Sequence, residues 1–332
     1  MEEVSVRDAL KSLSSRYAAM LFIIPANYLL SAYIFFLPAS LILAAVTGSG
    51  AIDSNTGSGY TLTFVLNALM SYTIPMLAAA LLFGKFIEKG GTDAGDEGYR
   101  RFPLDTVMLY FAGLFLASTG SIVTNFVSEQ LNSLYGTPEP EQAFSDLMPT
   151  SLYTFAVIAI NTIIVAPLCE ELIYRHFLLK PLRKYGDAAA VVVSAMLFSI
   201  SHYNFDQMLY TFFFGAFLGI IVVRSDSVIP ALICHAVNNL TAVLQSYLPE
   251  TFGSEAADSF FGALSGGARA FALLAYYTGA VAALAAVLMK MLRMKDRCEL
   301  AVRTQFAVIF GSPGVIIGIA ASFGLTVLLL YS

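Results

Sequence analysis

The stretch TSLYTFAVIAINTIIVAPLCEELIYRHFLL, residues 150–179, decides the fold of this chain. It is long enough to cross a hydrocarbon core of roughly 30 Å, which takes about 20 residues of helix. Its interior nevertheless carries Glu170, Glu171 and Arg175. Charged side chains at that depth are costly unless they pair with one another or face a polar cavity. The stretch therefore predicts a membrane helix that contributes to a buried polar site.

Composition extends this prediction to the whole chain. Of the 332 residues, 58% are hydrophobic and only 12% are charged, far from the averages of water-soluble domains. The apolar runs are continuous rather than alternating, which is typical of helices. We predict an all-α, polytopic transmembrane helical bundle of about eight or nine membrane helices. They are expected near 17–46, 61–84, 106–127, 150–179, 188–202, 207–223, 228–246, 270–289 and 305–330.

Lys and Arg residues orient this bundle, because cytoplasmic loops are enriched in them. They gather before the first predicted helix and in every second connection, whereas the connections 47–60, 128–149, 203–206 and 248–268 contain none. The N-terminus is therefore expected in the cytoplasm, and the chain is expected to be a multi-pass protein of a cell membrane, the plasma membrane if the source is bacterial. Its surroundings are the lipid bilayer, and no nucleic-acid partner is expected.

Spacing groups the polar residues of the spans. Glu171 and Arg175 are four residues apart, so they share a helix face and can form an ion pair. Glu170 points about 100° away from Glu171 and is left to face something else. His235 and Asn239, four apart in a second span, share a face in the same way. With a rise of about 1.5 Å per residue, Glu170, His235 and Asn239 fall in one layer of the cytoplasmic half.

A third span adds His202, slightly deeper in the membrane, four residues after Phe198. Phe198 is expected to be a packing residue. Gly215 and Gly219, also four apart, are expected to let neighbouring helices approach closely beside the site. One polar constellation built from three non-consecutive helices is thus predicted.

Three patterns, Glu-Glu-x-x-x-Arg (170–175), Phe-x-x-x-His (198–202) and His-x-x-x-Asn (235–239), resemble those of the CAAX protease and bacteriocin-processing family, which also includes abortive-infection proteins. This family comprises glutamate-dependent intramembrane endopeptidases. The resemblance covers 150–246 and divides the chain into N-terminal transmembrane helices (1–149), a catalytic core (150–246) and C-terminal transmembrane helices (247–332).

The resemblance implies a role for each motif residue. Glu170 would activate water with the help of His202, while His235 and Asn239 would stabilise the oxyanion. Glu171 and Arg175 match supporting positions. The expected activity is metal-free hydrolysis of peptide bonds, without a cofactor, in a peptide or membrane-protein substrate.

Two alternatives stay open at this stage. Glu170, His202 and His235 could instead be ligands of a zinc ion in a membrane protease. The chain could also be non-enzymatic, a transporter or a scaffold such as a bacteriocin immunity protein, in which the buried charges form a relay or a binding pocket.

Overall fold

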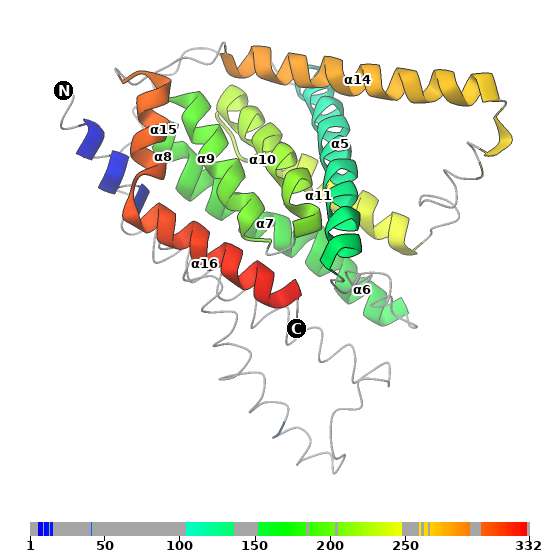
Figure 1. Ribbon diagram of the computed structural model, residues 1–332, viewed down its shortest axis with the longest axis horizontal. Helices are drawn as coiled ribbons and strands as arrows, with labels where there is room; N and C mark the ends of the chain where they lie inside the picture. Colours follow the sequence, from blue (N-terminus) through cyan, green and yellow to red (C-terminus); the bar gives the residue numbers. More distant parts are fainter. Residues whose placement is uncertain are drawn as a thin grey trace.

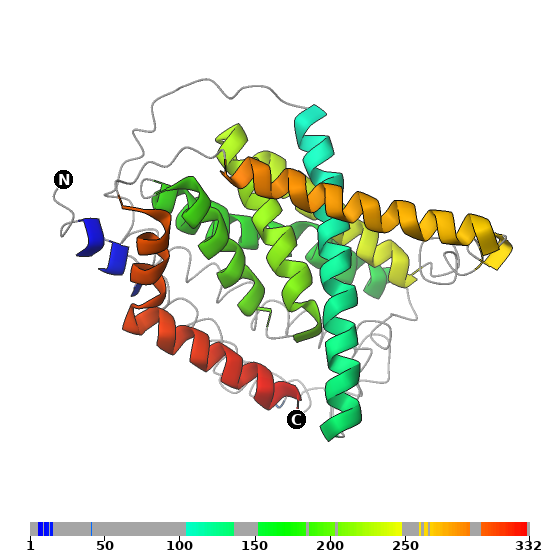
Figure 2. The ribbon, with the colours of Figure 1, turned by 45° about the horizontal axis from the view of Figure 1, so that its top comes forward.

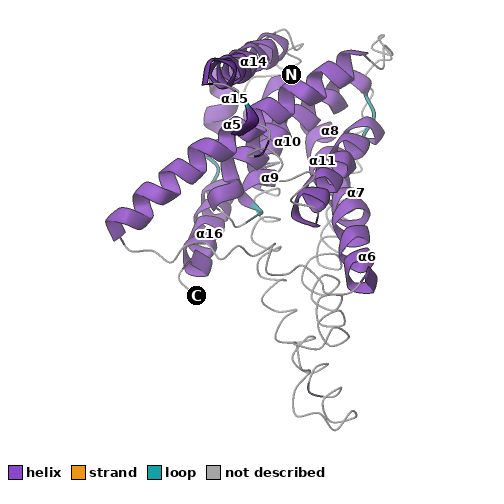
Figure 3. Cartoon of the chain, turned by 90° about the vertical axis from the view of Figure 1, so that its right-hand side faces the viewer, coloured by secondary structure: helices purple, strands orange, loops and turns teal. Residues whose placement is uncertain are grey.

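The computed structural model describes residues 104–135, 152–183, 186–202, 205–247, 266–292 and 300–330, with short pieces at 6–8, 10–12, 14–15, 41, 259 and 262–264. Throughout this part of the chain the regular structure is helical and no strand is present (Figure 3). The all-α prediction is confirmed there. The helices predicted near 17–46 and 61–84 lie outside the described residues, apart from residue 41.

The described helical elements lie over the predicted apolar runs, although the helix predicted over 106–127 continues to Tyr135. They are α5 (Leu104–Tyr135), α6 (Leu152–Ile160), η3 (Asn161–Val165), α7 (Ala166–Glu170), η4 (Glu171–Leu179), α8 (Lys180–Leu182), α9 (Asp187–Ile200), α10 (Phe205–Ser225), α11 (Ile229–Tyr247), α14 (Gly266–Leu292), α15 (Val302–Phe310) and α16 (Pro313–Leu330). The segments η3 and η4 are π-helical.

The α10 helix lies at the centre of this arrangement, with α5 on one side and α9 on the other (Figure 1). The long α14 crosses α5, which Figure 2 shows from a second direction. The α11 helix packs against η3, α7 and α10, and the α15 and α16 helices pack against α9. The core of the bundle is therefore formed around α10.

Small residues allow these helices to approach closely. A Cβ atom added to Gly215 would lie 2.9 Å from Phe198 Cδ1 and 3.3 Å from Ala195 Cα. One added to Gly219 would lie 3.1 Å from Leu179 Cδ1. The predicted role of this glycine pair is confirmed, because it brings α10 against α9 and against the helix that carries the carboxylates.

The single helix predicted over 305–330 is wrong, because α15 and α16 are separate helices bent by 65°. Gly311 and Ser312 end the first helix, and Pro313 begins the second, where a missing N–H costs nothing. The Ser312 hydroxyl accepts a hydrogen bond from the Val315 N–H at 3.3 Å and so caps α16.

Two described helices are long and apolar enough to cross a membrane on their own, through Tyr110–Val127 of α5 and Gln207–Ser225 of α10. The bent α15–α16 pair would make a third if it counts as one span. The chain is thus a helical membrane protein with two or three candidate spans in its described part. The larger count of eight or nine and the cytoplasmic N-terminus stay predictions.

Candidate active site

The helix that carries the two carboxylates runs without interruption through α6, η3, α7, η4 and α8, but it is not regular. At the end of η3 the Ala166 N–H donates to the Asn161 carbonyl, five residues back rather than four. At the end of η4 the Lys180 N–H donates to the Arg175 carbonyl with the same spacing. Such π-helical turns occur frequently at functional sites. Glu170 and Glu171 lie at the junction between α7 and η4.

The imidazole of His235 joins the two carboxylates. Its Nδ1 atom lies 3.0 Å from Glu171 Oε1, and its Nε2 atom lies 3.4 Å from Glu170 Oε2. All three side chains are buried. The directions of Glu170 and Glu171 diverge along the helix, as the sequence predicts, yet both end at one ring because its two nitrogens point to opposite sides. The sequence missed this bridge, which depends on how α11 packs against α7.

The predicted ion pair between Glu171 and Arg175 is present, with 3.4 Å between Glu171 Oε2 and Arg175 Nε. Arg175 is 0% exposed, and its guanidinium lies over the Phe198 ring, 4.8 Å from the centroid. None of its three nitrogens makes a hydrogen bond to another described residue. Charge and ring contact therefore hold this guanidinium, rather than a set of directed hydrogen bonds.

The charges of the cluster are nearly balanced. Two carboxylates and one guanidinium leave one negative charge, which a single proton on His235 or on a carboxyl group cancels. Glu170, Glu171 and His235 lie within contact distance of one another, so a proton on any one of these side chains is close to the other two. General acid–base chemistry can use such an arrangement.

His202 ends its helix with one ring nitrogen fixed. Its Nδ1 atom lies 2.8 Å from the Phe198 carbonyl oxygen, which can only accept, so Nδ1 carries the hydrogen and Nε2 keeps its lone pair. The Ser201 hydroxyl donates to the same carbonyl at 2.8 Å, and the Tyr174 hydroxyl donates to Ser201 Oγ at 2.6 Å. This arrangement holds His202 in the tautomer that can accept a proton at Nε2.

Phe198 connects His202 to the carboxylate cluster. Its ring contacts the His202 ring edge-on at 4.7 Å and the His235 ring at 5.8 Å, in addition to the guanidinium of Arg175. Within the described residues no hydrogen bond joins His202 directly to Glu170. The packing role predicted for Phe198 is confirmed.

Asn239 binds the carboxylate-bearing helix at a different level. Its Nδ2 atom donates to the Thr162 carbonyl at 2.8 Å. This carbonyl lies in η3. The Ala166 N–H, which would bond to it in an α-helix, bonds to the Asn161 carbonyl instead, and Pro167, which would bond to it in a π-helix, has no N–H. The side chain of Asn239 thus satisfies a backbone acceptor that the proline leaves open.

Two further polar residues join Asn239 that the sequence motifs did not contain. The Asn238 Nδ2 atom donates to Asn239 Oδ1 at 3.4 Å, and the Tyr210 hydroxyl donates to Asn238 Oδ1 at 2.7 Å. Asn238 is a second amide in an apolar helix, and this was the one feature of the sequence that could have indicated its place in the site. Tyr210 gave no signal, because a tyrosine in a membrane helix is common.

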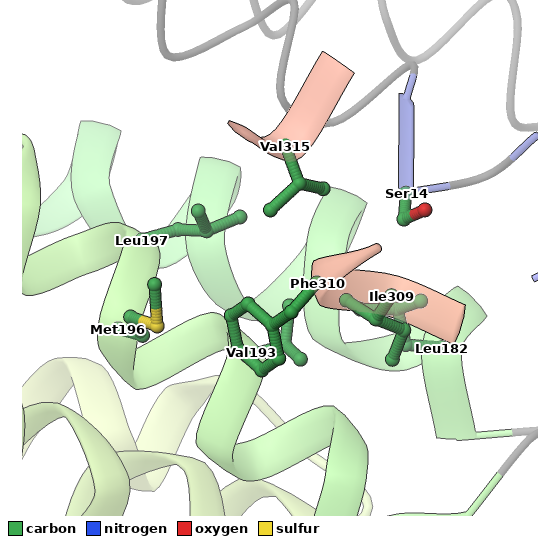
Figure 4. Close-up of a pocket in the computed structure, with 8 residues that line it drawn as sticks. All are labelled: Ser14, Leu182, Val193, Met196, Leu197, Ile309, Phe310 and Val315. Carbon is green, nitrogen blue, oxygen red and sulfur yellow. The ribbon is translucent and has the colours of Figure 1, made fainter. Parts of the chain in front are cut away.

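Metal ligation was the alternative for Glu170, His202 and His235. Among the described residues, no group of three or more His, Cys, Asp or Glu side chains lies in an arrangement that could hold a metal ion. A small apolar pocket lies elsewhere, between Val193 and Leu197 of α9 and Ile309 and Val315 of the bent helix pair (Figure 4). None of the residues that line it belongs to the polar cluster.

Comparison with protein families places this geometry in context. Residues 152–241 match the family model described as Rce1-like, Type II CAAX prenyl endopeptidase Rce1-like. The matched segment runs from α6 into α11 and contains all three motifs. The resemblance drawn from the motifs is therefore confirmed for this segment, which is similar to that endopeptidase family. No curated protein and no solved structure matches the chain.

Proposed function

We propose that this chain is a multi-pass membrane endopeptidase in which Glu170 activates water for the hydrolysis of a peptide bond. One observation carries the proposal: two buried carboxylates share the imidazole of His235 inside the segment that matches the Rce1-like family. A structural ion pair would need one carboxylate for Arg175, and Glu171 fills that position. Glu170 is the carboxylate in excess.

Glu170 takes a proton from water as the water oxygen attacks the carbonyl carbon of the substrate. The carbonyl becomes an oxyanion, and the tetrahedral intermediate collapses when the C–N bond breaks and the leaving amine takes up the proton. General acid–base catalysis of this kind contributes roughly 100- to 10,000-fold in rate. His202, with its free lone pair at Nε2, assists in proton transfer.

The remaining polar groups stabilise charge in this mechanism. Glu171, held by Arg175, accepts the Nδ1 hydrogen of His235 and so presents Nε2 to Glu170 and to the reacting atoms. Asn239 uses one of its two amide hydrogens for the Thr162 carbonyl. The second hydrogen remains for the oxyanion, and fixed donors of this type are effective in a site of low dielectric constant.

Membrane-associated proteins or peptides are the proposed substrate class. The family description names a prenyl endopeptidase, and we extend to this chain only the hydrolysis of a peptide bond at the membrane. The proposed mechanism uses no metal ion and no cofactor.

The test compares wild type with Glu170→Gln, a change that keeps side-chain volume and removes the base. Quantitative proteomics of membranes from cells that express each form identifies candidate substrates, and peptides that span the cut sites, with and without a prenyl group, are then incubated with purified protein in nanodiscs. We expect activity to fall by about 100- to 10,000-fold while thermal unfolding is unchanged.

Glu129→Gln, at an exposed position of α5, is the matched control and should keep wild-type activity. A folded Glu170→Gln variant with full activity would rule out Glu170 as the catalytic base and so overturn the proposal. Activity that is lost to chelators and restored by zinc would overturn the metal-free mechanism.

A further inference from the structure

A chain of hydrogen bonds crosses the bundle from α10 through α11 to η3. We propose that Tyr210 and Asn238 are positioning residues that fix the orientation of the Asn239 amide beside the active site. The inference rests on the proposed function in one respect, since it assigns these residues to the reaction that Glu170 catalyses. The arrangement itself is a property of the fold.

The hydrogen-bond chain has a direction because its last acceptor is a backbone carbonyl. The Thr162 oxygen can only accept, so the NH₂ group of Asn239 must face it, at 2.8 Å. The Oδ1 atom of Asn239 then faces Asn238, whose NH₂ group donates to it at 3.4 Å. The Oδ1 atom of Asn238 accepts in turn from the Tyr210 hydroxyl at 2.7 Å.

Each link excludes the reversed orientation of the next. If Asn239 were turned over, its oxygen would face the Thr162 oxygen and its NH₂ group would face that of Asn238. Turning Asn238 alone would bring two amide oxygens together. Asn238 is buried and the other three residues are half-buried, so unpaired polar groups here are costly, and only one orientation satisfies all four groups. The Tyr210 hydroxyl supplies the hydrogen that the Asn238 Oδ1 atom accepts, which completes the hydrogen-bond chain.

Pro167 sets the direction of the hydrogen-bond chain, because it leaves the Thr162 carbonyl free to accept from Asn239. An N–H at that position would bond to the Thr162 carbonyl in the π-helical register and compete with Asn239. The proline of the catalytic helix therefore recruits an amide from α11. This bond also ties η3 to the level of α11 that lies one turn beyond His235, about 6 Å along the helix.

Aromatic packing keeps Tyr210, the first residue of the hydrogen-bond chain, in place. The Tyr210 ring stacks on Phe214, with 6.0 Å between centroids and 19° between planes, and Phe214 contacts the His235 ring edge-on at 5.5 Å. Asn238 is buried. The same aromatic pair thus supports both the amide chain and the imidazole that bridges the carboxylates.

The experiment compares Tyr210→Phe with Tyr277→Phe, which removes the same oxygen from an exposed position of α14. Protein labelled with ¹⁵N-asparagine reports the side-chain amides, and the Asn239 signals are assigned by their loss in Asn239→Ala. In the wild type we expect one set of Asn239 signals, with one proton shifted downfield and slow to exchange. In Tyr210→Phe we expect a second set or faster exchange.

Turnover of the peptides identified with Glu170→Gln gives the second readout. We expect Tyr210→Phe to lower kcat about tenfold with KM unchanged, which corresponds to about 1.4 kcal/mol of transition-state stabilisation. Tyr277→Phe should change neither the spectrum nor kcat. Unchanged Asn239 signals in Tyr210→Phe would overturn the inference whether or not the chain is a protease.

Altered Asn239 signals with unchanged kcat would also overturn it, because the amide would then be oriented for no catalytic purpose. Failure of the proposed function has a different signature. In that case Glu170→Gln keeps full activity, and the spectral effect of Tyr210→Phe is untouched.

Discussion

Two arginines on the carboxylate-bearing helix and its end are bound in opposite ways. Arg183 donates to Asp187 Oδ1 at 2.9 Å, to Asp226 Oδ1 at 2.6 Å and to the Val223 carbonyl at 3.4 Å, so each of its three nitrogens has a partner. Arg175 has an ion pair at 3.4 Å and a ring beneath it, and none of its nitrogens makes a hydrogen bond to a described residue.

The difference separates a structural ion pair from one that we assign to the proposed active site. The hydrogen bonds of Arg183 tie the end of α8 to the beginning of α9 and to the turn after α10, which is what a fastening between helices requires. Arg175 provides charge in a place where no described residue accepts a hydrogen bond from it, and a buried charge of this kind is weak support for stability. Its position is explained by the carboxylates that it balances.

The largest effect is expected for Arg175→Met, which leaves Glu171 as a buried carboxylate without its cation. Removing one partner of a buried pair costs about 3–5 kcal/mol, so we expect a large loss of stability together with loss of activity. The chain contains no Trp, so unfolding is followed by circular dichroism and, in a background with Cys234→Ala and Cys298→Ala, with a thiol-reactive dye that reports exposure of the buried Cys169.

The double variant Arg175→Met with Glu171→Gln is the control for Arg175→Met. Removing both charges should restore most of the stability but not the activity. Stability that stays low in the double variant would show that Arg175 acts through packing on Phe198 rather than through charge.

Arg183→Met should have an intermediate effect. The side chain loses hydrogen bonds to two carboxylates, each worth about 1.5–3 kcal/mol, but Asp226 is largely exposed and water replaces part of the interaction. We expect a loss of stability below that of Arg175→Met, and a specific activity per folded molecule close to wild type. Loss of activity without loss of stability would place Arg183 in the site and remove the contrast.

The smallest effect is expected at Asp226, which has a left-handed backbone with φ of 52°. Asp226→Asn tolerates that conformation and keeps the acceptor for Arg183, so the cost should stay below about 1 kcal/mol and unfolding should depend less on salt. Asp226→Ala, which adds backbone strain, should cost more. Equal unfolding temperatures for the two variants would show that φ at this position is unimportant.

Much of the fold could be predicted from the sequence. The predicted ranges 188–202, 207–223 and 228–246 agree with α9, α10 and α11 to within a few residues, because polar residues mark both ends of each apolar run. The break at Ser312 was missed, since hydrophobicity does not change across it and only Gly311 and Pro313 indicate it. The π-helical segments could not be predicted, because the same side chains occupy a π turn and an α turn.

The site was predicted only where its residues share a helix. The Glu171–Arg175 pair depends on a spacing of four and was found. The bridge made by His235 and the bond from Asn239 to Thr162 depend on the packing of α11, which no local pattern reveals. The short distances from Lys180 and Arg183 to Asp226 do support one longer inference, that these two basic residues lie at the same end of the bundle as the turn after α10.

The π turn of η3 has a consequence for the ancestry of the site. Relative to an α-helix, one extra residue is accommodated in this turn, and its wider spacing absorbs the rotation of about 100° that one added residue would otherwise give every later side chain. A chain that lost a single residue at 161–165 could close the π turn into an α turn and still direct its carboxylates at His235. Loss of one residue from the regular turn at 166–170 would instead rotate them away, so a one-residue gap has opposite consequences in two neighbouring turns of the same helix.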